Sequence, residues 1–334
     1  MRPSVSVIMP VKNAMPYLSA CLDSILNQTF KDWELIAVND GSDDDSEETL
    51  LAYARGDSRI RVYNNSGTGI IPALQLAYKK SSGNYIHRMD ADDLMLPEKL
   101  QSLLDLLKDR GNGYVATGHV QYFSENGVGE GYRNYENWLN SLCQNRSHWK
   151  EIYKECVIAS PCWMLHRKDL DRCGAFDSDI YPEDYDLVFR FYKNRLRVLS
   201  TSKILHLWRD HKLRTSRNHV HYQQNAFFRI KLHYFFELER DAKRPLVIWG
   251  AGPKGKIMAK LLQSRKETFT WVSNNPKKHG KEIYDQIMHS FHVILEKDNP
   301  QVIVTVAQRN AQKDIIAFLH KKGLKEATDF YLFR

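Results

Sequence analysis

Long apolar runs are missing from this sequence of 334 residues. No window approaches the ~18 uninterrupted apolar residues that a membrane-spanning helix needs. The apolar stretch that follows Arg2 and ends at Pro10 is shorter than the hydrophobic region of a signal peptide. We therefore expect a soluble, cytoplasmic protein.

Cysteine is also scarce. The chain has five cysteines and no C-x-x-C pair. An odd number without such a pair argues against a disulfide framework and against a structural zinc site. We expect reduced, mostly buried thiols.

The composition has none of the extremes of a non-globular protein. Hydrophobic residues make up 43% and charged residues 26% of the chain, which excludes a disordered, collagen-like or coiled-coil protein. At roughly 150 residues per domain, the length suggests two domains. The net charge of +8 is uneven, because residues 1–198 carry 23 Lys and Arg against 28 Asp and Glu, whereas residues 199–334 carry 25 against 12. The acidic part can hold cations and the basic part can face anions.

Apolar spacing predicts alternating strands and helices in the first part of the chain. We expect strands at 4–9, 33–38, 59–63, 85–89 and 114–117, and helices at 16–26, 46–54, 72–80, 97–110 and 184–194. This order indicates an α/β fold with a largely parallel sheet covered by helices.

A second, smaller α/β domain is predicted after a polar linker at 239–245. A strand at 246–249 leads into the turn Gly250-Ala-Gly252-Pro-Lys-Gly255 and then into a helix. Further strands are expected at 268–272 and 302–306, with a helix near 311–321. This pattern is typical of a Rossmann-like domain, which we place at 244–334.

Polar side chains gather where the predicted strands of the first domain end. Asn13 follows the first strand, Asp40 follows the second, and Asp90, Asp92 and Asp93 follow the fourth. In open sheets of this kind, ligands bind beyond the carboxyl ends of the strands. The sequence therefore predicts one ligand site on this rim.

Asp90 and Asp92 form a D-x-D triplet that can hold a divalent cation. Mg²⁺ and Mn²⁺ prefer oxygen ligands, and Mg²⁺ usually takes one or two carboxylates and fills its shell with substrate and water. Because the chain has five such triplets, the spacing alone decides little. The alternative is that Asp93 caps the following helix while Asp90 and Asp92 are only solvated.

Four segments in order give this triplet its context. They are VSVIMP at 5–10, WELIAVNDGS at 33–42, GNYIHRMDADD at 83–93 and EDYDL at 183–187. The series resembles the family 2 glycosyltransferases over about residues 4–217. The resemblance implies a GT-A fold, with helices on both faces of a mixed, mostly parallel sheet. It also implies an inverting enzyme that transfers a sugar from a nucleotide diphosphate to an acceptor hydroxyl with Mn²⁺ or Mg²⁺.

The resemblance places several residues on the donor side. Asp40 takes the position of the carboxylate that receives the imide N–H of uracil, so a UDP-sugar is the expected donor. Pro10, Asn13 and Arg88 are expected beside it. The resembling proteins often carry an aromatic residue where this chain has Lys12.

The resemblance also implies the metal site and the catalytic base. Asp92 is the expected metal ligand, Asp90 is expected to touch ribose or metal, and Asp184 is the expected base. His211 lies in a segment, Trp208-Arg-Asp-His211 followed by Thr215-Ser216, that resembles the Arg-x-His and Ser run of the family, which places His211 near the metal or the diphosphate. Two alternatives stay open: Asp184 as an acid that only stabilises a helix N-terminus, and His211 as one of several surface histidines.

General chemistry supports two separate carboxylates. Displacement at an anomeric carbon passes through an oxocarbenium-like state. A metal at Asp92 neutralises the leaving diphosphate, while a carboxylate on the opposite face takes the proton of the acceptor. On the acceptor side we place Glu183 and Trp163. The expected acceptor is a glycan or a lipid-linked glycan, as in polysaccharide or glycoconjugate assembly, and the expected sugar is a hexose or an N-acetylhexosamine.

Gly250, Gly252 and Gly255 fit the pattern G-x-G-x-x-G, which allows a pyrophosphate to approach a helix N-terminus. An NAD(P)-type oxidoreductase centred on this loop is the alternative function. It would need an acid about 20 residues later for the ribose, where the chain has Ser273-Asn274-Asn275. A nucleotide-like or regulatory site, or a packing role, stays open.

Two further expectations concern partners. We expect no nucleic-acid binding, because no such motif accompanies the basic C-terminal part. Residues 218–243 are predicted to be a helical connector, so that the transferase domain spans 1–217. The aromatic and basic segment 225–236 is expected to be core, with a peripheral contact at the inner face of the membrane as the alternative.

Overall fold

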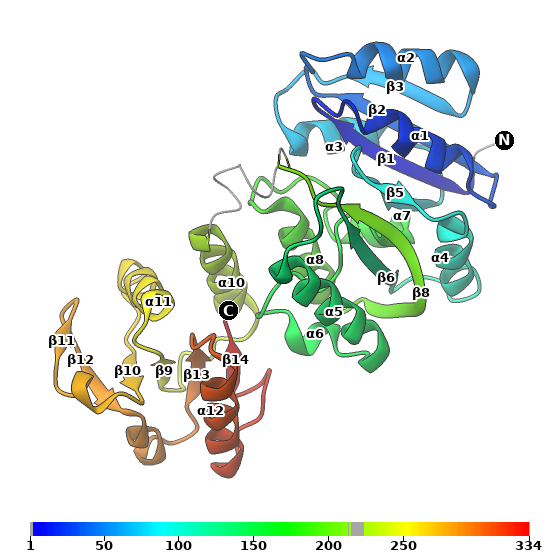
Figure 1. The fold of residues 1–334 in the computed structure, drawn as a ribbon. Helices are drawn as coiled ribbons and strands as arrows, with labels where there is room; N and C mark the ends of the chain where they lie inside the picture. The colour runs from blue at the N-terminus through cyan, green and yellow to red at the C-terminus, as the bar shows by residue number, and fades with distance from the viewer. Residues whose placement is uncertain (1–2, 213, 215–223, 334) are drawn as a thin grey trace. The chain divides into compact units, whose positions relative to one another are not determined.

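The computed structural model describes residues 3–212, 214 and 224–333, except for the side chains of 224–226. The chain divides into two compact units (Figure 1). The first unit consists of Met1–His148 and Val157–Asn218, and the second of Trp149–Cys156 and His219–Arg334. The division into 1–217, 218–243 and 244–334 stays a prediction.

The first unit is built on one sheet, whose strands are β1 (Val5–Val11), β2 (Trp33–Asn39), β3 (Ile60–Asn64), β4 (Tyr85–Arg88), β5 (Leu94–Met95), β6 (Tyr114–Phe123), β7 (Trp163–His166) and β8 (Arg197–Arg209). Among the described residues their order is β3-β2-β1-β4-β7-β6-β8-β5. Strands β3, β2, β1 and β4 pair in parallel, as do β6 and β8. Strand β7 is antiparallel to β4 and β6, and β5 is antiparallel to β8. The predicted mixed, mostly parallel sheet is confirmed.

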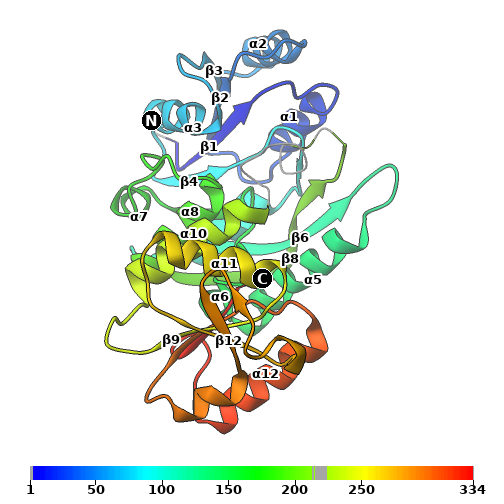
Figure 2. The same cartoon turned by 90° about the vertical axis from the view of Figure 1, so that its left-hand side faces the viewer.

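Helices cover both faces of this sheet, as expected. They are α1 (Leu18–Leu26), α2 (Ser46–Gly56), α3 (Ile70–Lys80), α4 (Lys99–Leu107), α5 (Glu130–Asn145), α6 (His148–Glu151), α7 (Arg167–Arg172) and α8 (Glu183–Lys193). Figure 2 shows α1 on one side of β1 and α3 on the other. Helix α1 buries Leu18, Cys21, Leu22 and Ile25, which lie three or four residues apart and so share one face.

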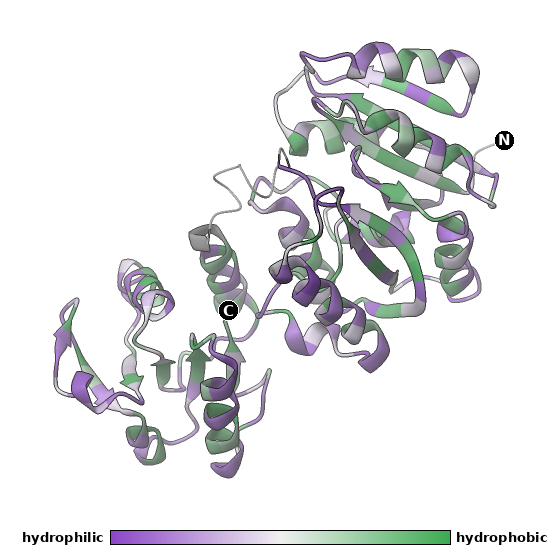
Figure 3. Ribbon diagram, in the orientation of Figure 1, coloured by the Kyte–Doolittle hydropathy of each residue, from purple (hydrophilic) through white to green (hydrophobic). Residues whose placement is uncertain are grey.

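The core of the first unit lies along β1 and β2. Every residue of β2 is buried, as expected for a strand covered on both faces. Figure 3 colours the central strands of this sheet largely as hydrophobic. Two polar groups in this core satisfy each other, because the Ser6 hydroxyl donates to Glu34 Oε1 over 2.6 Å. The Ser6 hydroxyl is therefore buried and hydrogen-bonded.

The long strand β8 was not predicted. Its burial is irregular, with an exposed stretch at 202–204 followed by buried Leu205 and His206. Such a strand has no clean alternation of apolar and polar residues, so the period-two signal is absent. The missed strand matters because its end brings Arg209 and His211 to the rim where the polar residues gather.

The second unit has its own sheet. Its strands are β9 (Leu246–Trp249), β10 (Thr270–Ser273), β11 (Glu282–Ile283), β12 (Gln286–Ser290), β13 (Gln301–Val304) and β14 (Phe330–Leu332), and its order among the described residues is β11-β12-β10-β9-β13-β14. Its helices are α10 (Gln224–Leu238), α11 (Pro253–Ser264), α12 (Arg309–Lys321) and the 3₁₀ helices η2 (Pro276–Lys278) and η3 (Phe291–Glu296). The neighbouring strands β12, β10, β9, β13 and β14 all pair in parallel. This sheet confirms the predicted second α/β domain.

Helix α10 contains the whole segment 225–236. Phe228, Leu232 and Phe235 are at most 3% exposed, which agrees with the expected core role. Across the described part of the chain, no helix combines the length and the apolar character that crossing a membrane requires.

Candidate active site

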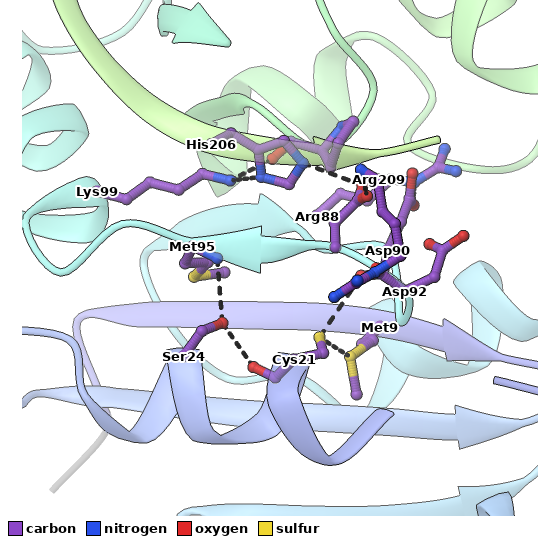
Figure 4. Close-up of polar contacts among 12 residues, drawn as sticks. Met9, Cys21, Ser24, Arg88, Asp90, Asp92, Met95, Lys99, His206 and Arg209 are labelled. Atoms are coloured by element: carbon purple, nitrogen blue, oxygen red, sulfur yellow. Dashed lines mark hydrogen bonds and ion pairs between the residues drawn. The ribbon is translucent and has the colours of Figure 1, made fainter. Parts of the chain in front are cut away.

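The loop after β4, residues 90–93, is called the aspartate loop here. It turns between β4 and β5, with the Asp93 amide donating to the Asp90 carbonyl over 3.3 Å. The thiol of Cys21 in α1 donates to the same carbonyl over 3.6 Å (Figure 4). The side chains of Asp90 and Asp92 are 24% and 26% exposed, so both carboxylates can reach a ligand on the rim.

Asp92 is paired with His211. His211 Nε2 lies 2.8 Å from Asp92 Oδ2, and the His211 ring packs on Tyr17 with centroids 4.7 Å apart. Loss of hydration acts to raise the pKa of Asp92, but the His211 hydrogen bond and the charge of Arg214 outweigh it and lower the pKa. Asp92 therefore stays ionised, and His211 lies beside the aspartate that is predicted to bind the metal. Thr215 and Ser216, the other part of the resembling segment, lie outside the described residues.

This pair fits a divalent cation only with help from the ligand. The described residues contain no group of three or more His, Cys, Asp or Glu side chains arranged around one point. His211 also has a buried Nδ1 that lacks a hydrogen-bond partner among the described residues. A carboxylate and an imidazole are donors that Mn²⁺ accepts, with phosphate oxygens and water completing the shell. The two side chains therefore suit a cation that arrives with a diphosphate.

Arg88 joins the aspartate loop to the start of α8. It lies at the end of β4, is buried, and donates to Asp90 Oδ1 over 3.1 Å and to Glu183 Oε1 over 3.2 Å. Loss of hydration raises the pKa of Asp90, while the Arg88 charge opposes the shift. The guanidinium thus holds two carboxylates from segments 93 positions apart.

Asp184 stands in the first turn of α8. Its Oδ1 accepts the Tyr185 amide over 2.8 Å, and its side chain is partly exposed. Loss of hydration and then the charge of Glu183 raise the pKa of Asp184 to about 7, against the opposing charge of Arg88. A carboxylate that titrates near neutral pH is suited to general base catalysis.

Asp40 is held at the end of β2. Both of its carboxylate oxygens lie 3.0 Å from the Gly69 amide, and Asn65 Nδ2 donates to Oδ1 over 2.6 Å. Lys12 Nζ lies 3.6 Å from Asp40 Oδ2. Where the resembling proteins often carry an aromatic ring, this chain therefore places a half-exposed ammonium beside the carboxylate.

Tyr181 connects the Asp40 end of the rim with the α8 end. Loss of hydration raises the pKa of Tyr181, and the charges of Glu183 and Asp40 raise it further. A Cβ on Gly69 would lie 3.7 Å from the Tyr181 hydroxyl, and the Gly69 amide donates to Asp40, so Tyr181, two residues before α8, lies close to the end of β2.

Asn13 and Pro10 have structural partners of their own. Asn13 has a positive φ of 49°. Its side-chain Oδ1 accepts the backbone amide of Asp43 over 2.8 Å, and its backbone amide donates to Ser42 Oγ over 3.0 Å. These bonds tie the loop after β1 to the loop after β2. Pro10 lies in β1, pairs with Val38, and is partly exposed at the same end of the sheet.

The structure gathers most of the predicted residues but keeps Trp163 inside. Its ring is 1% exposed and lies 6.0 Å from the Phe191 ring, and its carbonyl lies 2.7 Å from His87 Nδ1. Trp163 therefore packs in the core beside the end of β4, whereas Glu183, next to Asp184, stays on the rim. The individual roles of the rim residues stay predictions.

Sequence reasoning missed the residues behind the aspartate loop. Asp93 does not cap α4, whose N-cap is Glu98 and has no side-chain capping bond. Instead Asp93 lies 3.0 Å from Nε2 of His206, which is fully buried and not one of the surface histidines of this stretch. Burial lowers the pKa of His206, and lowers that of Lys99 beside it to about 8. No local signal could have found this contact, because the residues are 113 positions apart.

The glycine loop of the second unit has two glycines fixed by packing. Gly250 has a φ of 141°, and a Cβ there would collide with Thr305 Oγ1; a Cβ on Gly255 would collide with the Gly250 carbonyl. Gly252, at the start of α11, faces open space. Asn274, near where a ribose-binding acid was sought, accepts a hydrogen bond from Trp249 Nε1. The close approach of Thr305 therefore accounts for Gly250, and the close approach of α11 to the Gly250 carbonyl accounts for Gly255.

Comparison with known proteins supports the first unit's resemblance. Residues 6–174 match the sequence model described as Glycosyl transferase family 2. The O-antigen biosynthesis glycosyltransferase WbnJ of Escherichia coli is 30% identical over 234 residues, which cover 68% of this chain and 87% of WbnJ. The uncharacterized glycosyltransferase EpsJ of Bacillus subtilis is 29% identical over 213 residues, covering 63% of this chain and 62% of EpsJ. The chain spans less than two thirds of several such relatives, only 24% of one from Rickettsia bellii.

Two solved structures share the fold. Staphylococcus aureus TarS 1–349 in complex with UDP-GlcNAc has a TM-score of 0.54 at 18% identity, covering 78% of this chain and 72% of that one. The mannosyltransferase PcManGT from Pyrobaculum calidifontis, in complex with GDP-Man and Mn²⁺, has a TM-score of 0.53 at 18% identity, covering 78% and 70%. Nothing in these comparisons supports the oxidoreductase alternative. The family match, the E. coli relative and the GT-A fold agree: this chain belongs to glycosyl transferase family 2.

Proposed function

We propose that this protein transfers a sugar from a UDP-sugar to a hydroxyl of an acceptor glycan, with inversion at the anomeric carbon. The observation that carries the proposal is Asp184, a carboxylate whose pKa lies at about 7, on the same rim as the ionised Asp92 and its partner His211. We assign the reaction to residues 1–217, with 218–243 as a connector to a separate domain at 244–334.

The donor side is supported by Asp92, His211 and Asp90. A divalent cation held there would neutralise charge on the leaving diphosphate. Arg88 adds a fixed positive charge next to Asp90. The complex of PcManGT with GDP-Man and Mn²⁺ supports Mn²⁺ as the first cation to test.

Asp184 supplies the acceptor side of the chemistry. The acceptor oxygen forms a bond to the anomeric carbon as its proton passes to Asp184. The bond between the anomeric carbon and the phosphate oxygen breaks, and its electron pair leaves with the diphosphate. Because attack and departure occur on opposite faces, the configuration inverts.

The proposed uridine preference depends on Asp40. An ionised carboxylate has about four acceptor positions, and the protein donates to Asp40 from Gly69 and Asn65, which leaves capacity for the imide N–H of uracil. The TarS complex with UDP-GlcNAc supports a uridine donor, and the role of WbnJ in O-antigen biosynthesis supports a glycan acceptor.

A donor panel tests the proposal. Release of nucleoside diphosphate is measured from UDP-, GDP- and dTDP-sugars, each with Mn²⁺, with Mg²⁺ and with EDTA. We expect metal-dependent release from a UDP-sugar and none after Asp184→Asn. Equal release from all three donors would contradict the role of Asp40 in recognising uracil. If no donor is bound or turned over, the proposed function is wrong.

A further inference from the structure

A row of buried polar side chains leads from α4 to the aspartate loop (Figure 4). Lys99 Nζ donates to the Pro161 carbonyl over 2.5 Å and lies 2.8 Å from His206 Nδ1. His206 Nε2 lies 3.0 Å from Asp93 Oδ2. Lys99 and His206 are fully buried and Asp93 is 1% exposed. Solvation therefore does not explain why these three positions carry polar side chains.

The contacts fix the direction of each hydrogen bond. An ammonium can only donate, so Nδ1 of His206 accepts from Lys99. The proton of the neutral imidazole is then on Nε2, which donates to Asp93. Lys99 therefore selects the form of His206 that can hold Asp93.

Stability alone is a poor reason for this row. Burying charged groups costs solvation, and apolar side chains of similar volume in their place are often neutral or stabilising. The second unit has a buried lysine too, Lys231, whose ammonium donates to the Lys154 carbonyl over 2.8 Å. The row at Lys99 differs because it ends on the aspartate loop.

Asp93 passes this support on to Asp92. The second oxygen of Asp93 accepts the Arg209 amide over 2.7 Å, and Arg209 Nε donates to the Asp92 carbonyl over 2.7 Å. The Arg209 guanidinium lies between the rings of Tyr17 and Phe123, 4.5 Å from each centroid. The backbone carbonyl of Asp92 is thus held by Arg209, while its carboxylate is paired with His211.

We propose that Lys99, His206 and Asp93 are positioning residues that orient Asp92 for the cation and the diphosphate of the donor. They do not touch the donor themselves. The inference rests on the proposed function, because it assumes that Asp92 serves donor binding.

Lys99→Met tests the row, with Lys231→Met as the matched control. Binding of Mn²⁺ in the presence of UDP is followed by electron paramagnetic resonance of free Mn²⁺, and donor KM and kcat are measured together with the melting temperature. Loss of a group that orients a metal ligand typically costs 10- to 100-fold in affinity. We expect Lys99→Met to weaken Mn²⁺·UDP binding about tenfold, to raise KM in proportion and to leave kcat within about threefold, whereas Lys231→Met leaves all three unchanged.

His206→Gln and His206→Leu decide the question if Lys99→Met does not fold. Glutamine keeps one acceptor for Lys99 and one donor for Asp93, and leucine keeps neither. We expect glutamine to bind Mn²⁺·UDP within about threefold of the wild type and leucine about tenfold more weakly. Equal affinities for the two variants would overturn the positioning role, as would a Lys99→Met protein that binds like the wild type. A wild-type protein that binds no Mn²⁺·UDP would overturn the proposed function together with this inference.

Discussion

In both units the carboxyl ends of parallel strands form a rim, but the residues at these strand ends differ between the units. In each, a buried parallel strand, β1 or β9, leads through a loop into a helix. The rim of the first unit ends in carboxylates with shifted pKa values and partial exposure. The rim of the second unit ends in Gly250 and Gly255, which serve close packing, and Lys278 donates to the Ala251 carbonyl over 2.7 Å. The difference teaches that topology places a site, and that the side chains at the strand ends give it chemistry.

The sharpest test of this comparison is Asp184→Asn. Removal of a general base costs about 10²- to 10⁴-fold in rate, so we expect kcat to fall at least about 100-fold while donor affinity stays unchanged. The measurement is single-turnover transfer together with a donor binding titration. Equal losses in rate and affinity would place Asp184 on the donor side instead.

A stability measurement separates this loss from misfolding. Because burial raises the pKa of Asp184, the folded chain holds this proton more tightly than the unfolded chain, and the resulting stability is lost as pH rises through about 7. Asparagine removes the cost of the charge. At pH 8 the variant should melt at the same temperature as the wild type or higher, and a lower value would mean that Asp184 is structural.

Asp92→Ala should produce the next largest effect. Loss of a metal ligand should cost at least the 10- to 100-fold in affinity that loss of an outer-shell partner costs. We therefore expect donor KM with Mn²⁺ to rise about 100-fold, with a smaller change when EDTA replaces the metal. The matched variant Asp44→Ala, at the loop after β2, should leave the metal dependence intact. An unchanged KM for Asp92→Ala would move the cation elsewhere.

The pH profile should show the acidic limb of Asp184. The ionised form is the active base, so kcat/KM should rise about tenfold per pH unit below 7 and level off above it. The profile is best measured at saturating Mn²⁺ between pH 5.5 and 8.5. A flat profile, or one that falls as pH rises toward 7, would contradict this role.

Substitutions in the glycine loop should have the smallest effects. They test whether this loop serves packing and not sugar transfer. Gly255→Ala forces a Cβ against the Gly250 carbonyl and should lower the free energy of unfolding by about 1–3 kcal/mol. Gly252→Ala points into open space and should change it by less than about 0.5 kcal/mol. Urea denaturation measures both. Sugar transfer by the folded Gly252→Ala protein should equal that of the wild type. A loss of donor turnover in this variant would mean that the glycine loop contributes to activity.

Local signals explain how much of this could be predicted. Strands β1 and β2 are mostly apolar and buried, and β4 is mostly buried, so the strand ends, with Asp40 and the aspartate loop, could be placed from the sequence. The support behind the loop could not, because Asp93, His206 and Arg209 meet only through tertiary pairing of β5 with β8. Trp163 shows the reverse case, since an aromatic residue near the site packs inward.

The contacts that residues of β8 make with Asp93 in the aspartate loop have a consequence for synthesis of the chain. The imidazoles of His206 and His211 follow their aspartate partners by 113 and 119 positions. At 5–20 residues per second, a ribosome needs roughly 6–24 s to add such a stretch. During that interval the nascent chain already contains Asp92, the predicted cation ligand, but not the strand that holds it. We therefore expect binding of a metal-bound nucleotide to begin only after β8 has been synthesised.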